Sequence, residues 1–181
     1  MRLGNVNTRL LSVVIAILPL FMLLILNPVQ AANFTAGTAD ELKTAIDAAN
    51  DEVAHPGMDM ITITQSIAIP DTFDFNITSW IVIQGSDFTF NGVSKPSGLF
   101  SIQTGGKLQL NNLTISGFNA PLQNIAGELY IQNSILESNT AAVQNHGHVE
   151  FLNVNLGINQ AESGGAFHNF PDATALIAGG Q

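Results

Sequence analysis

Glutamates in the second half of the chain are the residues whose type and spacing best suit catalysis. Glu128, Glu137 and Glu150 lie one, ten and three residues after a glycine that opens a short apolar segment. Glycosidases need two or three carboxylates that converge within about 5 to 9.5 Å. Glu128 and Glu150 could lie on one outward strand face, about one repeat apart, and they form the candidate catalytic pair. Solvated faces also carry such pairs, so a purely surface role is the alternative.

Histidines near residue 150 are the candidate metal ligands. A single glycine separates His146 from His148, and His168 follows later in the chain. Alternate residues of a strand point to one side of a sheet, and histidine is a common zinc ligand. The repeat described below places His148 and His168 in different columns, however, so a shared metal would need a bend in the chain. We therefore expect surface histidines and no cofactor.

Residues 1–31 have the pattern of a secretory signal. Two arginines precede an apolar run over residues 10–26, and Val29 and Ala31 fit the small-residue rule for cleavage after Ala31. An uncleaved membrane anchor is the alternative, because the run is almost as long as the ~20 residues that span a bilayer. Either way, contact with a membrane is expected only through this segment. The chain has no cysteine, so a packed core rather than disulfides must hold the exported protein together.

The charge balance argues against nucleic acid as a partner. Cleavage after Ala31 would leave Lys43, Lys95 and Lys107 against all 14 acidic residues, a net charge of −11. Nucleic-acid binding needs a basic stripe that neutralises phosphates, and three scattered lysines do not make one. The acidity instead favours solubility of an exported protein.

One amphipathic helix is predicted over residues 38–50. Thr38 and Glu41 have the spacing of a capping box. The apolar residues Leu42, Ala45, Ile46 and Ala49 fall on one face of the helix. The helix should therefore cover an apolar surface, and we expect Leu42 and Ile46 to pack near Ile61 and Ile63.

Three segments of similar pattern follow, each opened by a glycine: GKLQLNNLTISGF at 106–118, GELYIQNSILESN at 127–139 and GHVEFLNVNLGIN at 147–159. Aliphatic residues recur two and four positions after the glycine, asparagine at the seventh place and an aliphatic residue at the tenth. The period is 21 and then 20 residues. A second tripeptide pattern recurs alongside these segments: LQN at 122–124, VQN at 143–145 and FHN at 167–169.

A period near 21 with short strands predicts a parallel β-solenoid, in which each turn of the chain stacks on the last and equivalent residues form columns. The expected inward columns are Leu108, Leu129, Val149; Leu110, Ile131, Phe151; and Ile115, Leu136, Leu156. The strand candidates are 60–64, 80–84, 88–90, 99–103, 107–110, 113–115, 128–131, 149–152 and 174–177. Trp80 opens one of these strands and is expected in the core.

A structural ladder of asparagines is expected at Asn112, Asn133 and Asn153, the seventh position of each repeat. A side-chain amide at a bend can bond the copies above and below it and satisfy turn backbone. We expect Asn133 to be buried in this column.

A further rung begins near the end of the sequence. Thr174, Leu176 and Ala178 align with Val149, Phe151 and Asn153. The solenoid is therefore expected to be cut within a rung, and its last edge to pair with another chain or with sequence beyond residue 181.

The sequence resembles the right-handed parallel β-helix proteins of the pectin-lyase-like fold. The stretch ELKTAIDAANDEVAHPGMDMITI is similar to the N-terminal cap of secreted bacterial members, and LQLNNLTISG and IQNSILESNTAAVQN are similar to their rungs. The stretch SGGAFHN resembles the repeats of polymorphic outer-membrane proteins and autotransporter passengers. The resemblance covers about residues 36–178. It implies an all-β chain with a cap over residues 32–58 and a right-handed parallel β-helix over 59–181.

This scaffold carries lyases, hydrolases, adhesins and structural surface proteins, so the resemblance alone does not select a function. Lyases of the fold use an arginine or lysine base beside a calcium site of clustered aspartates, whereas the cleaved chain has no arginine and no rung presents an aspartate pair. We expect a non-catalytic secreted or cell-surface module, adhesin-like or structural, that binds an extracellular glycan or a surface protein along an extended face. A polysaccharide lyase or glycoside hydrolase is the alternative.

Overall fold

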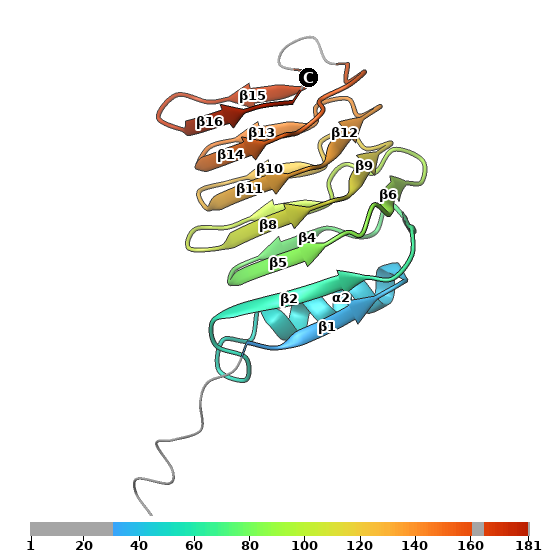
Figure 1. Cartoon of the computed structure of the whole chain (residues 1–181), viewed down its shortest axis with the longest axis vertical. Coiled ribbons are helices and arrows are strands. Elements are labelled where there is room, and N and C mark those ends of the chain that lie inside the picture. The colour runs from blue at the N-terminus through green and yellow to red at the C-terminus, as the bar shows by residue number, and fades with distance from the viewer. Residues whose placement is uncertain (1–30, 161–164, 181) are drawn as a thin grey trace, which may run out of the picture.

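The described part of the chain forms a parallel β-solenoid of about six turns with one short helix (Figure 1). The computed structural model describes residues 31–160 and 165–180. The secretory signal expected at 1–31 therefore lies outside the described residues, apart from its last residue. Each turn of the coil contributes strands to up to three sheets, and every strand pair described is parallel. The all-β solenoid predicted from the repeat is confirmed.

The largest sheet has seven strands in the order β1 (Asn33–Ala36), β2 (Met58–Ile63), β5 (Trp80–Gln84), β8 (Lys107–Asn111), β11 (Glu128–Gln132), β14 (His148–Leu152) and β16 (Thr174–Ala178). The second has five, β4 (Phe75–Ile77), β7 (Phe100–Ile102), β10 (Leu122–Asn124), β13 (Val143–Asn145) and β15 (Phe167–Asn169). The third has four, β3 (Ile67–Ile69), β6 (Thr89–Gly92), β9 (Thr114–Ser116) and β12 (Ile135–Glu137).

Rung length varies more than the repeat predicts. Along the seven-stranded sheet, successive partners in one column are 22, 27, 21, 20 and 26 residues apart: Met58, Trp80, Lys107, Glu128, His148 and Thr174. The average is about 23 residues. The period of 20 to 21 seen in the sequence belongs to the two rungs with the tightest turns. The longer rungs keep the strands in register and place their extra residues in the turns.

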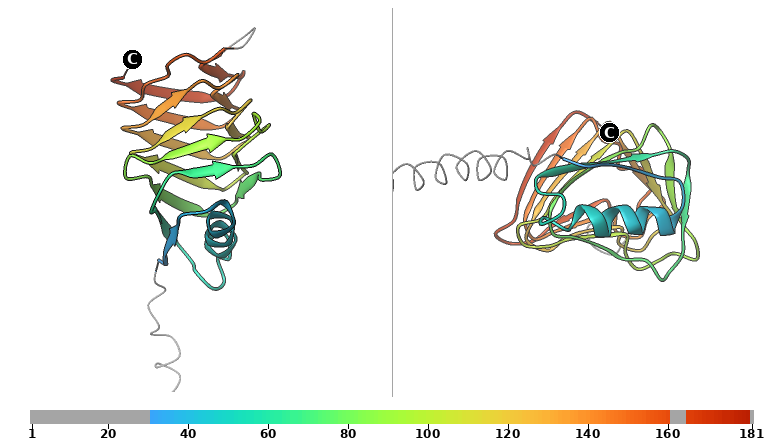
Figure 2. Two further views of the ribbon diagram at one scale, coloured as in Figure 1. Left: turned by 90° about the vertical axis from the view of Figure 1, so that its right-hand side faces the viewer. Right: turned by 90° about the horizontal axis from the view of Figure 1, so that it is seen from below.

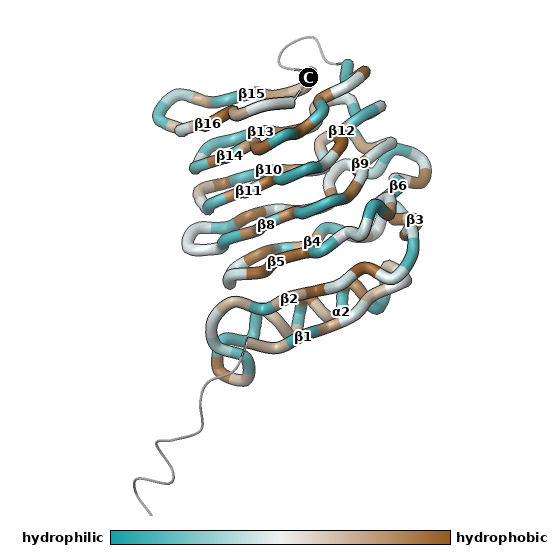
Figure 3. Tube along the Cα trace, viewed as in Figure 1, coloured by the Kyte–Doolittle hydropathy of each residue, from teal (hydrophilic) through white to brown (hydrophobic). Residues whose placement is uncertain are grey.

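The core lies inside the coil. Buried and partly exposed residues alternate along strands such as β8 and β11, and Figure 3 shows the hydropathy of each residue along the chain. The first two predicted inward columns are confirmed, because all six members are buried: Leu108, Leu129, Val149, Leu110, Ile131 and Phe151. Ile115 and Leu136 are buried in the third column, and Leu156 packs against the core while partly exposed. Phenylalanines fill the lower rungs, where the Phe100 ring lies 5.7 Å from Phe75 and 6.0 Å from Phe90.

The glycine that opens each repeat is required by the close stacking of turns. A Cβ atom on Gly106 would clash with the carbonyl oxygen of Ile77 in the rung below. A Cβ on Gly127 would clash with the Gly106 carbonyl, and one on Gly147 with the Gly127 carbonyl. Successive turns therefore approach backbone to backbone at this corner of the coil, which only glycine permits.

Helix α2 (Ala39–Ala49) lies across the N-terminal opening of the coil (Figure 2). The Thr38 hydroxyl caps the helix by accepting from Glu41 N–H at 3.2 Å, and the Glu41 carboxylate accepts from Gly37 N–H at 2.8 Å. Leu42 and Ile46 are fully buried in the same core as the first rung. The predicted capping helix is confirmed, with Thr38 and Asn50 as its capping residues.

The last strand, β16, is present but its predicted register is wrong by one residue. Ala175 pairs with Val149 and Ile177 with Phe151, so Leu176 falls opposite Glu150 in an outward column. A shift of one residue moves every side chain of a strand to the other face. The segment TALIA allows the error because its last four residues are all apolar, so either alternation places apolar residues inward.

A buried asparagine ladder exists at a different column from the predicted one. Asn124 Nδ2 donates to Asn145 Oδ1 at 2.7 Å, and Asn145 Nδ2 donates to Asn169 Oδ1 at 2.7 Å. Gly127 N–H also donates to Asn124 Oδ1 at 2.9 Å, so one side chain joins two rungs and its own turn. Asn124 and Asn145 are fully buried.

The predicted burial of Asn133 is wrong. Asn112, Asn133 and Asn153 have φ of 52°, 48° and 55°, a left-handed conformation that asparagine tolerates better than most residues. Asn133 and Asn153 are exposed, and Asn112 is half-buried. One bond of the expected ladder is present, from Asn153 Nδ2 to Asn133 Oδ1 at 2.9 Å. Asparagine recurs at this position because the bend needs a positive φ.

Replacing the middle of the buried ladder should destabilise the fold more than replacing the bend residue. Asn145→Ala would leave buried amide and turn groups without partners, at about 1 to 3 kcal/mol for each group. Asn133→Gly removes an exposed side chain and keeps the left-handed bend, so its effect should stay within about 0.5 kcal/mol. Thermal melting of the two variants measures the difference, and equal losses would contradict the ladder's role.

Truncating the helix on its buried face should also be costly. Leu42→Ala leaves a cavity over the first rung and should lower the free energy of unfolding by about 2 to 5 kcal/mol. The neighbouring Lys43→Ala removes only an exposed ion pair with Asp47 and should cost less than about 1 kcal/mol. Denaturant unfolding of both variants provides the comparison. A Leu42→Ala variant as stable as Lys43→Ala would show that the helix does not close the core.

Candidate functional site

The outward face of the seven-stranded sheet carries a group of ionisable and aromatic side chains that contact one another. Strand register places Trp80, Lys107, Glu128, His148 and Thr174 in one outward column, and Gln109, Tyr130 and Glu150 in the next. Four consecutive strands, β5, β8, β11 and β14, therefore contribute to one surface. We name the aromatic–ionic cluster by its six members: Trp80, Lys107, Glu128, Tyr130, His148 and Glu150.

Lys107 is the centre of this cluster. Its Nζ lies 2.7 Å from Glu128 Oε2 and 4.8 Å from the centroid of the Trp80 ring. The same Nζ lies 5.5 Å from the Tyr130 ring. A cation within about 6 Å of an aromatic ring is attracted by the ring's negative face. Lys107 thus links three neighbouring strands and orders the two large aromatic side chains of the surface.

Glu128 and Tyr130 share a short hydrogen bond that changes the pKa of both groups. The Tyr130 hydroxyl donates to Glu128 Oε2 at 2.6 Å. Hydrogen bonds from Lys107 and Tyr130 hold the pKa of the Glu128 carboxyl below its ordinary value. The bond to that carboxylate, helped by partial desolvation, raises the pKa of Tyr130 to about 12. Glu128 is therefore ionised and Tyr130 neutral at physiological pH.

His148 and Glu150 form the upper part of the cluster. His148 Nε2 lies 3.0 Å from Glu150 Oε1, and His148 Nδ1 lies 2.7 Å from the Thr174 hydroxyl. The Tyr130 and His148 rings meet edge to face with centroids 6.0 Å apart. The imidazole is held from both sides, so its plane is fixed against the sheet.

The structure brings the candidate catalytic pair to one face, on adjacent strands, but supplies each carboxylate with its own partner. Glu128 contacts Lys107 and Tyr130, while Glu150 contacts His148. A glycosidase needs one carboxylic acid that is still protonated at working pH, which requires a raised pKa. Because the pKa of Glu128 is lowered, its carboxyl group is deprotonated and does not suit the role of general acid. Glu137 lies on β12 of another sheet.

The histidines do not converge. His148 lies on β14, but His146 occupies the turn between β13 and β14, and His168 lies on β15 of the five-stranded sheet. The rings of His146 and His168 stack on Phe170, with centroids 3.6 and 4.1 Å from its ring. Within residues 31–160 and 165–180, no group of three potential ligands could hold a metal. The expectation of separate columns is confirmed by the strand register.

Trp80 was wrongly expected in the core. It is 42% exposed, because it pairs with Lys107 in the outward column, while its neighbours Ile81 and Ile83 point inward. The run Trp-Ile-Val-Ile hides the alternation, since apolar residues occupy both faces. Alignment of this strand with the Gly-Lys-Leu segment at 106–108 was the signal that could have placed Trp80 outside.

A shallow groove of about 370 Å³ runs beside the cluster. Its floor is formed by the stacked glycine turns, and Glu128, His148 and Asp172 lie along it. The backbone is accessible there because glycine has no side chain. The groove extends the cluster's surface towards the five-stranded sheet.

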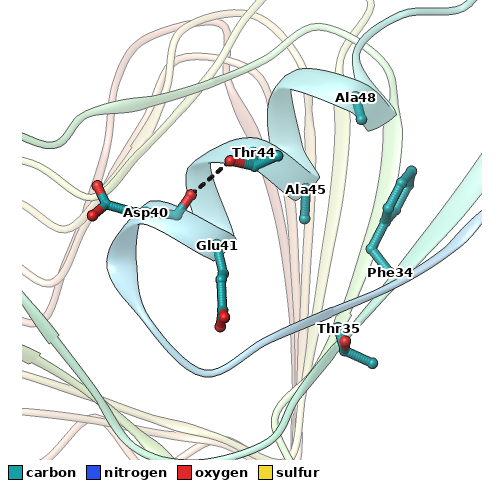
Figure 4. A pocket seen from close by; sticks show the side chains of 7 residues that line it. All are labelled: Phe34, Thr35, Asp40, Glu41, Thr44, Ala45 and Ala48. Carbon is teal, nitrogen blue, oxygen red and sulfur yellow. Dashed lines mark hydrogen bonds between the residues drawn. The ribbon is translucent and has the colours of Figure 1, made fainter.

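A separate pocket of about 320 Å³ lies between β1 and α2 (Figure 4). Phe34, Ala45 and Ala48 line it with apolar surface, and the helix residues Asp40 and Glu41 stand at one end. The Glu41 carboxylate is already bonded to Gly37 N–H. None of the residues lining this pocket belongs to the aromatic–ionic cluster.

Comparison with known protein families, curated proteins and solved structures finds no match for this chain. In the described part of the chain, no helix is long and apolar enough to cross a membrane. The candidate site therefore rests on the geometry of the cluster and the groove.

The hydrogen bond between Tyr130 and Glu128 can be tested directly, because Tyr130 is the single tyrosine of the chain. The absorbance of tyrosinate should titrate with a midpoint of about 12 in the folded protein. Glu128→Gln removes the carboxylate charge and should move the midpoint towards the ordinary value of about 10. Circular dichroism at each pH establishes that the protein is folded. A midpoint near that of unfolded protein would show that the bond is absent.

Proposed function

We propose that this protein is an exported, non-catalytic β-solenoid module that binds an extracellular or cell-surface glycan on the outward face of its seven-stranded sheet. Export is supported by the signal pattern at residues 1–31 and by the resemblance to secreted right-handed β-helix proteins of the pectin-lyase-like fold. A place outside the cell or in the cell envelope follows from that proposal. The observation that carries the binding function is the exposed Trp80 indole beside ordered, charged hydrogen-bonding groups.

The chemistry of the surface suits a sugar chain. A sugar ring presents apolar C–H groups on its faces and hydroxyls at its edge, so it matches an aromatic side chain that is flanked by donors and acceptors. Lys107, Glu128 and Glu150 supply those polar groups on strands spaced ~4.8 Å apart. An extended sugar chain can therefore contact equivalent positions on consecutive rungs.

The charge favours a neutral glycan over a polyanion. The chain carries a net charge of −9, and the one lysine of the cluster is already paired with Glu128. A polyuronate would meet Glu128, Glu150 and Asp172 without an excess of positive charge. We therefore place neutral polysaccharides first, and the same charge argument makes nucleic acid an unsuitable partner.

A polysaccharide lyase or glycoside hydrolase is the second candidate. One observation favours it: Lys107, Glu128 and Glu150 share one face, and Glu128 borders the groove. Against it, the ammonium of Lys107 is paired with a carboxylate rather than free to act as a base, and Glu128 is ionised.

Trp80 is the single tryptophan, so its fluorescence reports binding at the cluster. Neutral and acidic polysaccharides should be titrated separately, and a neutral one should shift the emission with saturation. Trp80→Ala, measured by calorimetry, should weaken binding about tenfold or more, as expected for a central aromatic contact. Ile125→Ala, another exposed apolar residue outside the cluster, is the matched control and should bind normally.

The same mixtures should be assayed for unsaturated products and for new reducing ends, with and without calcium. Their appearance would overturn the non-catalytic assignment. Binding that is unchanged in Trp80→Ala, or strongest for polyuronates, would overturn the assignment of this face or of its ligand.

A further inference from the structure

Asp59 is a carboxylate buried among apolar columns. It lies on β2 and pairs with Ile81, whose own partner Leu108 belongs to an inward column of the core. The Asp59 side chain is fully buried. A buried charge is costly unless an opposite charge and several hydrogen bonds compensate it. The partners of Asp59 in this column are aliphatic, so the presence of an aspartate here calls for an explanation.

The partner of Asp59 is the backbone nitrogen of Ala32. Asp59 Oδ1 accepts from Ala32 N at 2.6 Å. The other oxygen, Oδ2, has no hydrogen-bond partner among the described residues. One amide N–H offers a single donor and no charge, so it leaves the carboxylate largely uncompensated.

We propose that Asp59 is the receptor for a new chain terminus created by cleavage between Ala31 and Ala32. A signal peptidase would hydrolyse this peptide bond by adding one water molecule, so that Ala31 leaves with the new carboxylate and Ala32 keeps the amine, which takes up a proton. The resulting ammonium group has three donors and a positive charge on the nitrogen that already lies beside Asp59. It can bond Oδ1 and also supply the donor that Oδ2 lacks.

A backbone hydrogen bond to β2 holds Ala32 in place. Its carbonyl oxygen accepts from Met60 N–H at 2.9 Å, which begins the parallel pairing of β1 with β2. The next residue, Asn33, pairs with Met60 in the sheet. The ammonium would therefore form where the amide now lies, without movement of β1. In the sequence, Val29 and Ala31 indicate cleavage of the peptide bond between Ala31 and Ala32. In the fold, the buried carboxylate of Asp59 supports the same bond independently.

The consequence is that processing stabilises the first rung. In the precursor, Asp59 is buried against a neutral amide, whereas in the cleaved chain it is half of a buried ion pair. This inference depends on cleavage and not on glycan binding, so the two proposals can fail separately.

The test uses the full chain, expressed in a secreting bacterial host. Mass spectrometry of the exported protein should show Ala32 as its first residue. A variant with one alanine inserted after Ala31 keeps the cleavage site but moves the ammonium one residue away from Asp59. Its melting temperature should fall by about 5 to 10 °C, as expected when a buried charge loses its partner. Mass spectrometry of this variant verifies that cleavage still follows Ala31.

Asp59→Asn provides the second arm. In this background the inserted alanine should have little further effect, because the charge that needs the ammonium is gone. Asp71→Asn, an exposed aspartate, is the matched control and should retain the full effect of the insertion. If Asp59→Asn does not fold, the reactivity of the α-amine towards an N-terminal-selective reagent decides: it should be slow in folded wild type and fast after unfolding or in the insertion variant.

Three results would each overturn the proposal. They are a mature chain that begins at another residue, an insertion that leaves the melting temperature unchanged, and an α-amine that reacts equally fast in folded and unfolded protein.

Discussion

The parallel stacking of rungs is the constraint on which this structure depends. Each backbone turn lies directly on the one below, so a residue's environment is set by the same position in the neighbouring rungs. Gly106, Gly127 and Gly147 show the steric side of this constraint, because a side chain there would strike the next carbonyl. Asn124 and Asn145 show the polar side, because a buried amide is satisfied by its own copy one rung away.

The same stacking assembles the outward surface from residues that are distant in sequence. Trp80, Lys107 and Glu128 are 27 and 21 residues apart but lie on adjacent strands. Their interactions run across the strands, so the cluster is ordered by the sheet and not by a loop. Lys107 pairs with Glu128, and Glu150 is hydrogen-bonded to His148, so the polar groups of the surface are preorganised, which suits recognition by shape and hydrogen bonding.

The sequence predicts the parts of the fold where burial and period agree. The columns of Leu108 and Leu110 follow from aliphatic spacing alone, and the cap helix follows from its apolar face. Prediction fails where one residue type serves two physical needs. Asparagine recurs at 112, 133 and 153 because the bend has a positive φ, and at 124 and 145 because amides stack in the core, and both columns have the same period. Trp80 fails similarly, since apolar residues lie on both faces of β5. The burial of Asp59 is hidden in the sequence because the other members of its column, such as Ile81 and Leu108, are aliphatic.

Polar side chains add to the sheet pairing of β1 and the apolar packing of α2 where the N-terminal unit joins the coil. Asn50 Nδ2 donates to the Asn76 carbonyl at 2.7 Å, and the Ser79 hydroxyl donates to the Ala49 carbonyl at 2.8 Å. These bonds fix one end of α2 to the rung above, while β1 and Asp59 fix the other side of the unit. An edge strand is paired on one side only, so each further bond at its end adds to its order. The charged terminus proposed at Ala32 would add an ion pair with Asp59 at the position where this unit begins, on a strand that is already paired.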